Sequence, residues 1–389
     1  MISDKLKPFG TTIFSEMTKL AQEHGAINLA QGFPDFEGPR AIVEAAQRAL
    51  DSGENQYARS LGHPALVQAL ADKYRTLAGL DFDPLREVVV FAGATEGIAS
   101  SLLGLLNPGD EVVLFEPFYD SYPAAVAFAG ATPRFCTLRF PDFALDEREL
   151  SQLFNDKTKL ILLNSPHNPT GKVFTRAELE VVARLCRDHD VVAVTDEVYE
   201  HITYDGVQTV ALASLPGMRE RTLTLSSTGK SFSLTGWKIG WGVGAAPLVA
   251  AAQAAHQFVT FSVATPLQVA MAFALREFQQ SYFAQLQREY AERRDFLVNE
   301  LRAAGFDVSV PKGAYFVLAD FTKRFPTAQF GDDRAVAKLL VEKHGIAAIP
   351  PSVFYKQSPE EGRRLLRFAF CKKMETLEKA AARLRKIGG

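Results

Sequence analysis

Five short and nearly continuous apolar runs constrain the fold of this chain more than any other feature of its sequence. They span residues 87–91, 111–115, 160–163, 191–195 and 222–225, and helical patterns such as residues 176–188 separate several of them. Continuous rather than alternating apolar runs are typical of parallel strands whose sheet is covered by helices on both faces. The sequence therefore predicts an α/β fold with a mostly parallel central sheet.

A different pattern fills the C-terminal part of the chain. With 389 residues, the chain exceeds what one hydrophobic core usually serves. A long helical pattern over residues 266–301 is followed by strand patterns at 306–310, 314–319 and 365–370 and by helical patterns at 335–344 and 375–387. This alternation predicts a second, smaller α+β domain.

Composition and charge argue against several classes of protein. The net charge of −2 leaves no basic footprint for nucleic acid. No apolar run approaches the roughly 20 residues that span a bilayer, and the first residues lack a signal-peptide core, so we expect a cytoplasmic protein. Three widely spaced cysteines and seven histidines without an HExxH pattern predict neither a disulfide framework nor a metal site.

Polar residues follow four of the apolar runs at the point where each strand would end. They are Tyr119 after the second run, Asn168 in a turn between two prolines after the third, Asp196 and Tyr199 after the fourth, and Lys230 among small residues after the fifth. Taken singly, turn chemistry or solvent exposure explains each of them equally well. Because ligands bind outside the carboxyl ends of parallel strands, the set together predicts a pocket.

Two further stretches have open interpretations. Residues 92–97 form a small-residue turn between a strand and a helix, which can aim backbone N–H groups at a phosphate but is also common in tight turns. The turn lacks the P-loop lysine and the GxGxxG pattern, which argues against an NTPase or a dinucleotide enzyme. The loop around Gly32 is either a simple connection or a place where the backbone approaches a ligand closely.

The residue types at the predicted pocket match one cofactor well, pyridoxal 5'-phosphate. This cofactor needs a lysine for its Schiff base and an acidic partner on its pyridine nitrogen. A phenol and an amide that donate to the ring oxygen stabilise the anion of that oxygen. The pocket thus predicts an enzyme that binds pyridoxal phosphate.

Three motifs resemble, in order and spacing, the signatures of the fold-type I, class I and II aminotransferases. They are the Asn-Pro-x-Gly turn at residues 168–171, the Asp-x-x-Tyr strand end at 196–199 and the Ser-x-x-Lys loop at 227–230. The similarity runs essentially from end to end. Within that family, residues 31–36, 116–122 and 196–201 resemble the branch of methionine, kynurenine and glutamine transaminases.

This resemblance implies a role for individual residues. The catalytic residues would be Lys230 as Schiff-base lysine and proton shuttle, Asp196 on the pyridine nitrogen and Tyr199 on the ring oxygen. The other residues implied to bind the cofactor are Ala94, Thr95, Tyr119, Asn168, Ser227 and Lys238, with Tyr57 reaching the phosphate of the neighbouring subunit in a homodimer. Many relatives have arginine where Lys238 stands, so we expect a point charge to contact the phosphate here.

The resemblance also implies how substrate binds and how the chain divides. Arg367 would grip the substrate α-carboxylate with its planar fork, helped by Asn168 and the backbone of Gly32. Residues 1–40 would join the small domain, residues 41–288 would form the large cofactor-binding domain, and residues 289–389 would form the rest of the small domain.

The predicted substrate is a neutral, aromatic or sulfur-containing amino acid, which gives its amino group to a 2-oxo acid by a ping-pong mechanism. Residues 257–265 contain no arginine or lysine that could pair a second carboxylate, and Phe14 and Phe261 would make the side-chain pocket apolar. These two phenylalanines could instead be core or interface packing. A β-lyase acting on cysteine conjugates would use the same scaffold, and a non-catalytic cofactor sensor is a weaker alternative because Lys230 and Asp196 are both present.

Overall fold

The computed structural model describes residues 2–278 and 280–388 of the chain. Among the described residues, seven strands form the central sheet, in the order β2-β8-β7-β6-β5-β3-β4. The strands are β2 (Val88–Phe91), β3 (Glu111–Glu116), β4 (Thr132–Thr137), β5 (Thr158–Asn164), β6 (Val192–Asp196), β7 (Thr222–Ser227) and β8 (Gly240–Gly244). Only β8 runs antiparallel to its two neighbours, and the other pairs are parallel. The predicted α/β fold with a mostly parallel sheet is confirmed.

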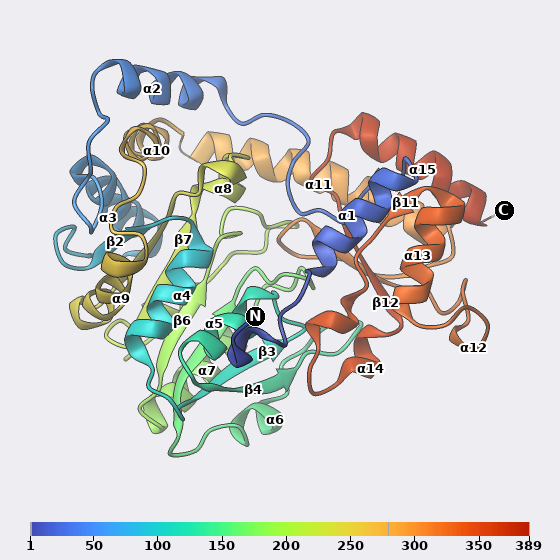
Figure 1. Cartoon of the computed structure of the whole chain (residues 1–389), viewed down its shortest axis with the longest axis horizontal. Helices are drawn as coiled ribbons and strands as arrows, with labels where there is room; N and C mark the ends of the chain where they lie inside the picture. Colours follow the sequence, from blue (N-terminus) through green and yellow to red (C-terminus); the bar gives the residue numbers. More distant parts are fainter. Residues whose placement is uncertain (1, 279, 389) are drawn as a thin grey trace.

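Helices cover both faces of this sheet (Figure 1). The helices of this part of the chain are α2 (Arg40–Asp51), α3 (Pro64–Ala78), α4 (Ala94–Leu105), α5 (Ser121–Phe128), α6 (Glu147–Ser151), α7 (Arg176–Asp188), α8 (Thr228–Ser231), α9 (Ala246–Val259) and α10 (Thr265–Glu277). On β5, Leu160 and Leu162 pack into the core cluster that contains α4 and α5, whereas Ile161 and Leu163 pack into the cluster that contains α7. Both faces of β5 are therefore buried, which explains its continuous apolar run.

The C-terminal part of the chain forms a second layered unit together with the N-terminal segment. Its elements are α1 (Ile13–Glu23), β1 (Ile27–Asn28), α11 (Gln280–Ala303), β9 (Asp307–Ser309), β10 (Phe316–Asp320), α12 (Thr327–Phe330), α13 (Asp333–His344), β11 (Ile346–Ala347), α14 (Pro359–Gly362), β12 (Leu365–Ala369) and α15 (Met374–Gly388). Strand β10 lies between β12 and β9, antiparallel to both. The pair β1 and β11 is parallel and joins the beginning of the chain to its end.

Some elements differ from the sequence-based prediction. Strands β4 and β8 were not predicted, and β8 carries glycine at every second position, so it has no apolar side-chain pattern on one face. The helical pattern predicted over residues 266–301 is two helices, α10 and α11. Residue 279, which falls between them, lies outside the described part of the chain. The predicted domain limits remain predictions. Helix α11 runs across the predicted boundary between residues 288 and 289.

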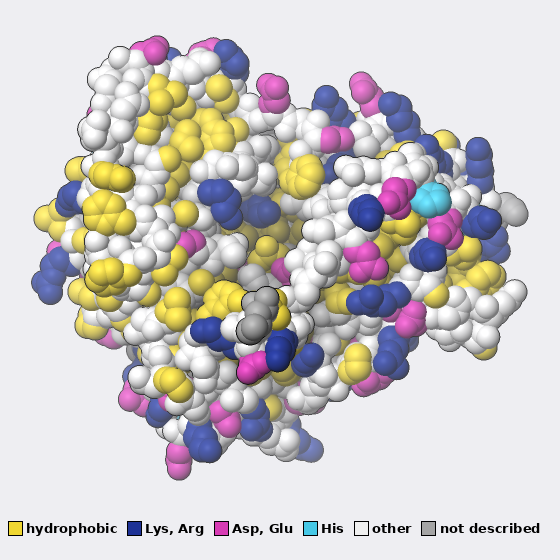
Figure 2. All heavy atoms as spheres, viewed as in Figure 1, with side chains coloured by type: hydrophobic (Ala, Val, Ile, Leu, Met, Phe, Trp, Pro, Cys, Tyr) yellow, Lys and Arg dark blue, Asp and Glu magenta, His cyan; other side chains and the backbone are white. Residues whose placement is uncertain are grey.

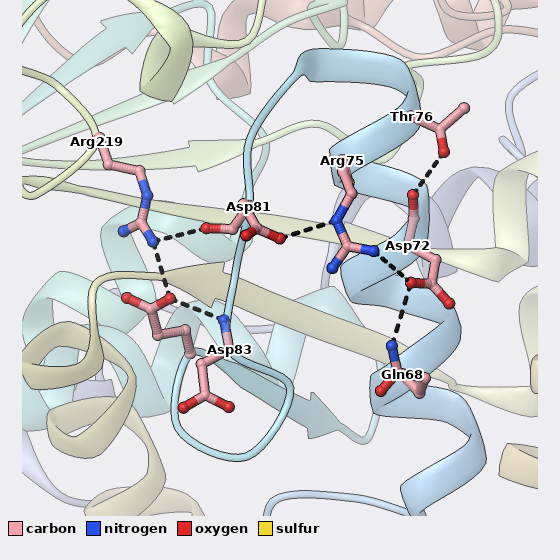
Figure 3. Close-up of polar contacts among 8 residues, drawn as sticks. Gln68, Asp72, Arg75, Thr76, Asp81, Asp83 and Arg219 are labelled. Atoms are coloured by element: carbon pink, nitrogen blue, oxygen red, sulfur yellow. Dashed lines mark hydrogen bonds and ion pairs between the residues drawn. The ribbon is translucent and has the colours of Figure 1, made fainter.

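A polar network ties α3 to the segment that leads into β2 (Figure 3). Arg75 donates to Asp81 at 2.9 Å and to Asp72 at 3.1 Å. Arg219 donates to the backbone carbonyl of Asp81 at 3.0 Å and to the carboxylate of Glu87 at 2.8 Å. Because most of these groups are exposed, we expect the network to orient the segment more than to stabilise the fold. None of the helices in the described part of the chain is both long and apolar enough to cross a membrane.

Candidate active site

A cavity of about 370 Å³ lies at the carboxyl ends of the parallel strands. Its lining brings together most of the residues singled out in the sequence: Phe14, Gly32, Ala94, Thr95, Tyr119, Asn168, Asp196, Tyr199, Ser227, Lys230, Lys238 and Arg367. They come from segments spread along most of the chain. Their convergence follows from topology, because β3, β5, β6 and β7 are parallel neighbours and end at one edge of the sheet.

Lys230 stands in the short helix α8, directly after β7. Its amine lies 5.6 Å from the ring centres of both Tyr199 and Tyr315. Burial lowers the pKa of Lys230 to about 8, because a charged amine loses hydration inside the protein. Near neutral pH this amine therefore loses its proton more easily than the amine of an ordinary lysine. A group that accepts and returns protons requires this property.

Asp196 is the last residue of β6 and is buried. Its Oδ2 accepts a hydrogen bond from the hydroxyl of Tyr122 at 2.7 Å, and its Oδ1 accepts one from the N–H of Val198 at 3.3 Å. Burial raises the pKa of this carboxyl group, and the hydrogen bond from Tyr122 opposes that rise. A buried carboxylate that lines a cavity is suited to pair with a cation of the ligand.

Asn164 connects two residues of the site from the end of β5. Its Nδ2 donates to the backbone carbonyl of Asp196 at 2.8 Å, and its Oδ1 accepts from the backbone N–H of Asn168 at 2.7 Å. The register explains this bridge, because Asn164 lies directly opposite Asp196 in the parallel pair β5 and β6. The side chain thus sets the turn that carries Asn168 against the end of β6.

Arg367 lies on β12 and is almost fully buried among aromatic rings. Its guanidinium carbon is 4.1 Å from the ring centre of Phe316, 5.1 Å from that of Phe14 and 5.7 Å from that of Phe354. Nη1 donates to Oδ1 of Asn168 at 3.1 Å and Nη2 to the carbonyl of Ala30 at 2.9 Å, while Nε has no hydrogen-bond partner among the described residues. Burial lowers the pKa of Arg367 to about 10, so the group stays charged at neutral pH and has donor capacity left for an anion.

The other end of the cavity is built to receive an anion. Helix α4 begins at Ala94, and its N-cap residue, Gly93, has no side chain that could cap the free N–H groups. Gly93 has φ +82°, and a Cβ there would lie 2.9 Å from Nζ of Lys238, so only glycine allows this lysine so close to the helix start. Free N–H groups, the helix dipole and a lysine are together suited to bind an anion such as phosphate.

Two residues singled out in the sequence lie outside this cavity. Tyr57 is 81% exposed, and its ring packs edge-on against Phe261, with the ring centres 5.2 Å apart. Phe258, at the end of α9, is 91% exposed. Figure 2 shows that hydrophobic side chains gather on the side of the molecule where α2, α3 and α9 lie. Within one chain, the structure does not bring Tyr57 and Phe261 to the residues they were expected to join.

Several residues of the site had no predicted role. Tyr122 lies within residues 116–122 and Asn164 directly follows the third apolar run, but neither was singled out. Asn164 is the last residue of β5, and Tyr122 lies three residues beyond Tyr119. Phe316 and Phe354 belong to the C-terminal unit, and only their tertiary contacts with Arg367 reveal them.

Comparison with known proteins agrees with the geometry. The family model "Aminotransferase class I and II" matches residues 24–384. The chain is 40% identical to a methionine aminotransferase of Escherichia coli, over 98% of this chain and 97% of that protein. It is 38% identical to a kynurenine–oxoglutarate transaminase of Dictyostelium discoideum, over 99% and 96% of the two chains. The solved structure of an N-succinyldiaminopimelate aminotransferase from Mycobacterium tuberculosis superimposes with a TM-score of 0.95, at 42% identity over 100% of both chains.

Proposed function

This chain belongs to the class I and II aminotransferases, a family that depends on pyridoxal phosphate. We propose that its cavity binds this cofactor and that the enzyme takes amino groups from neutral, aromatic or sulfur-containing amino acids. The observation that carries the proposal is the meeting of Lys230, Asp196 and the anion-binding start of α4 in one cavity. When bound, the cofactor supplies an electron sink for the bonds at the substrate Cα.

The residues present fit the cofactor at each of its functional groups. The start of α4, Ser227 and Lys238 would hold its phosphate, and Asp196 would pair with its ring nitrogen. Asn168 and Tyr199 would donate to its ring oxygen, and Tyr119 would cover its ring. Asp196 forms no ion pair within the described part of the chain, so the positive charge that this buried carboxylate requires would come from the ligand.

The chain's own residues would handle the substrate and its proton. Arg367 would bind the α-carboxylate through its unused donors, with Asn168 already holding one side of the guanidinium. Lys230 would take the proton from Cα and return it, for which its lowered pKa is suited. The rings of Phe14 and Phe316 would exclude water from this end of the cavity.

The charges of the lining support the substrate class. Among the described residues that line the cavity, three carry a cationic side chain: Lys230, Lys238 and Arg367. Each has a proposed partner other than the substrate side chain, so a second carboxylate, as in aspartate, would be buried without a counter-ion. An apolar side chain would instead gain roughly 25 cal/mol for each Å² buried.

We further propose a homodimer in which Tyr57 and Phe261 complete the cavity of the partner subunit. Their exposure, together with that of Phe258, supports an interface on this side of the molecule. An apolar patch of this kind is commonly covered by another subunit.

The test of this function is an amino-acid panel with one common 2-oxo acid. We expect kcat/KM for methionine, phenylalanine or kynurenine to exceed that for aspartate at least about tenfold, which corresponds to roughly 1.4 kcal/mol in the transition state. Parallel double-reciprocal plots would support the ping-pong scheme. Equal or better activity with aspartate would overturn the substrate class, and no transamination of any amino acid by cofactor-loaded protein would overturn the function.

A further inference from the structure

Tyr122 contacts the central carboxylate of the site from a helix that contributes no other residue to the cavity lining. It lies in the first turn of α5, its side chain is buried, and it lines the cavity. Its ring packs edge-on against that of Tyr119, with the ring centres 5.6 Å apart. Its hydroxyl donates to Oδ2 of Asp196 at 2.7 Å.

This hydrogen bond has no substitute at Asp196. Within the described part of the chain, Tyr122 is the one side chain that donates to the carboxylate, and Oδ1 has only the long contact with the N–H of Val198. Asn164 and the N–H of Ser165 bind the backbone carbonyl of Asp196, not its side chain. Among the described side chains, Tyr122 is therefore the one that fixes the rotation of the Asp196 carboxylate about its Cβ–Cγ bond.

We propose that Tyr122 is a positioning residue, which acts through its hydroxyl to orient the Asp196 carboxylate and keep it charged toward the ring nitrogen of the cofactor. The inference rests on the proposed function, because it presumes that Asp196 pairs with that nitrogen. A hydroxyl that donates to a carboxylate stabilises the charged form, whereas burial without a donor favours the neutral acid.

Other groups also act on Asp196 and do not replace this donor. The titratable groups whose charge interacts with Asp196 are Lys230 on α8, Tyr119 in the turn after β3, Tyr122 on α5, and Tyr199 and Glu197 in the turn after β6. Lys230 favours the charged carboxylate. The two other tyrosines remain neutral because burial raises their pKa values.

A purely structural role for Tyr122 is the competing explanation, because its ring also packs in the main core cluster. The variant Tyr122→Phe separates the two roles, since it keeps the ring and removes the hydroxyl. The measurement is the dissociation constant of pyridoxal phosphate from the full-length apoenzyme as a function of pH, followed by absorbance, together with kcat of the loaded enzyme.

Loss of the donor raises the pKa of Asp196, so the carboxylate becomes neutral at a higher pH. We expect the acid limb of cofactor affinity to move upward by about one pH unit, a tenfold change in proton affinity, and kcat to fall about tenfold. The matched control is Tyr204→Phe, which removes another buried tyrosine hydroxyl. That hydroxyl donates to the carbonyl of Ala314 and not to Asp196. The control should leave the acid limb unchanged.

A second variant keeps the test decisive if Tyr122→Phe does not fold. Difluorotyrosine at position 122 keeps the hydroxyl and makes it a stronger donor, so the acid limb should move downward. An acid limb that stays at the wild-type position in either folded variant would overturn the inference. Failure of the proposed function would look different, because the wild-type protein itself would then neither bind the cofactor nor transaminate.

Discussion

At the scale of single residues, the site depends on burial that changes what ordinary side chains can do. Lys230 loses part of its proton affinity and Arg367 keeps its charge although it is surrounded by rings. The same process, loss of hydration, acts on both, but the guanidinium starts from a much higher pKa. One cation can therefore exchange protons near neutral pH while the other remains a fixed positive charge.

The lowered pKa of Lys230 predicts how covalent attachment of the cofactor depends on pH. Only the neutral amine is nucleophilic, so the rate at which the apoprotein attaches pyridoxal phosphate should rise with pH and level off above about 8. Stopped-flow absorbance would follow this rate, and borohydride reduction with peptide mapping would locate the attachment. Lys230→Ala should attach none. A rate that keeps rising toward pH 10.5, as for an exposed lysine, or an adduct on another residue would contradict the prediction.

Much of the candidate site could be predicted at this scale. Asn168, Asp196, Tyr199 and Lys230 each follow an apolar run, so their meeting at one sheet edge follows from the parallel strand pattern. Tyr122 could not be assigned in the same way, because its hydrogen bond crosses from α5 to β6. Such a contact depends on how the helix packs and leaves no periodic signal in the chain.

At the scale of elements, the hairpin of β7 and β8 holds two cations of the site. Ser227 pairs with Gly240, so the chain between them, which carries Lys230 and Lys238, is a loop closed at both ends. A Cβ at Gly240 would lie 2.6 Å from the N–H nitrogen of Ala94, so the hairpin also packs directly against the start of α4. Sequence patterns could not predict β8, because its glycines pack closely against neighbouring atoms and carry no hydrophobic signal.

A second element-scale link joins the large sheet to the C-terminal unit through one buried carboxylate. At the end of β3, Glu116 accepts hydrogen bonds from the N–H groups of Lys356, Gln357 and Ser358 and from the hydroxyl of Thr137, at 2.7 to 3.0 Å. The segment it binds follows Phe354, one of the rings around Arg367.

Glu116→Gln should therefore destabilise the protein and weaken substrate binding. The amide nitrogen cannot accept, so buried N–H groups lose their partner, and we expect a loss of about 2–3 kcal/mol, seen as a lower Tm in calorimetry. KM should rise while Tm falls, because Phe354 loses its support. The matched control is Glu180→Gln, whose exposed pair with Arg176 at 3.9 Å should contribute only a few tenths of a kcal/mol. An unchanged Tm for Glu116→Gln would contradict this account.

At the scale of the whole molecule, the contacts within one chain do not explain why aromatic side chains near the end of α9 are exposed. Ser262 donates to the carbonyl of Ala58 at 3.0 Å, which holds the segment of Phe261 beside that of Tyr57. The sequence resemblance pointed to these residues, but the chain alone does not bring them to the cavity. Their proposed role depends on a second copy, which no pattern within one chain can reveal.

Phe258→Asp should therefore dissociate the proposed dimer and reduce turnover at least about tenfold, because a buried unpaired carboxylate costs several kcal/mol. Sedimentation velocity would report the monomer, and the same preparation would be assayed. The matched control is Leu85→Asp, at a leucine that is also exposed but belongs to the connection before β2. A wild-type protein that sediments as a monomer with full activity would contradict the shared site.

The pairing of β1 with β11 also sets an order of events during synthesis. Ile27 pairs with Ile346, so the ribosome must add roughly 300 residues between the two strands, which takes on the order of tens of seconds. During that interval, Ile13, Met17 and Ala21 of α1 have no partner from the C-terminal unit to cover them. The part of the chain made first thus waits for the part made last, and a truncation that removes the C-terminal unit would leave the apolar face of α1 uncovered.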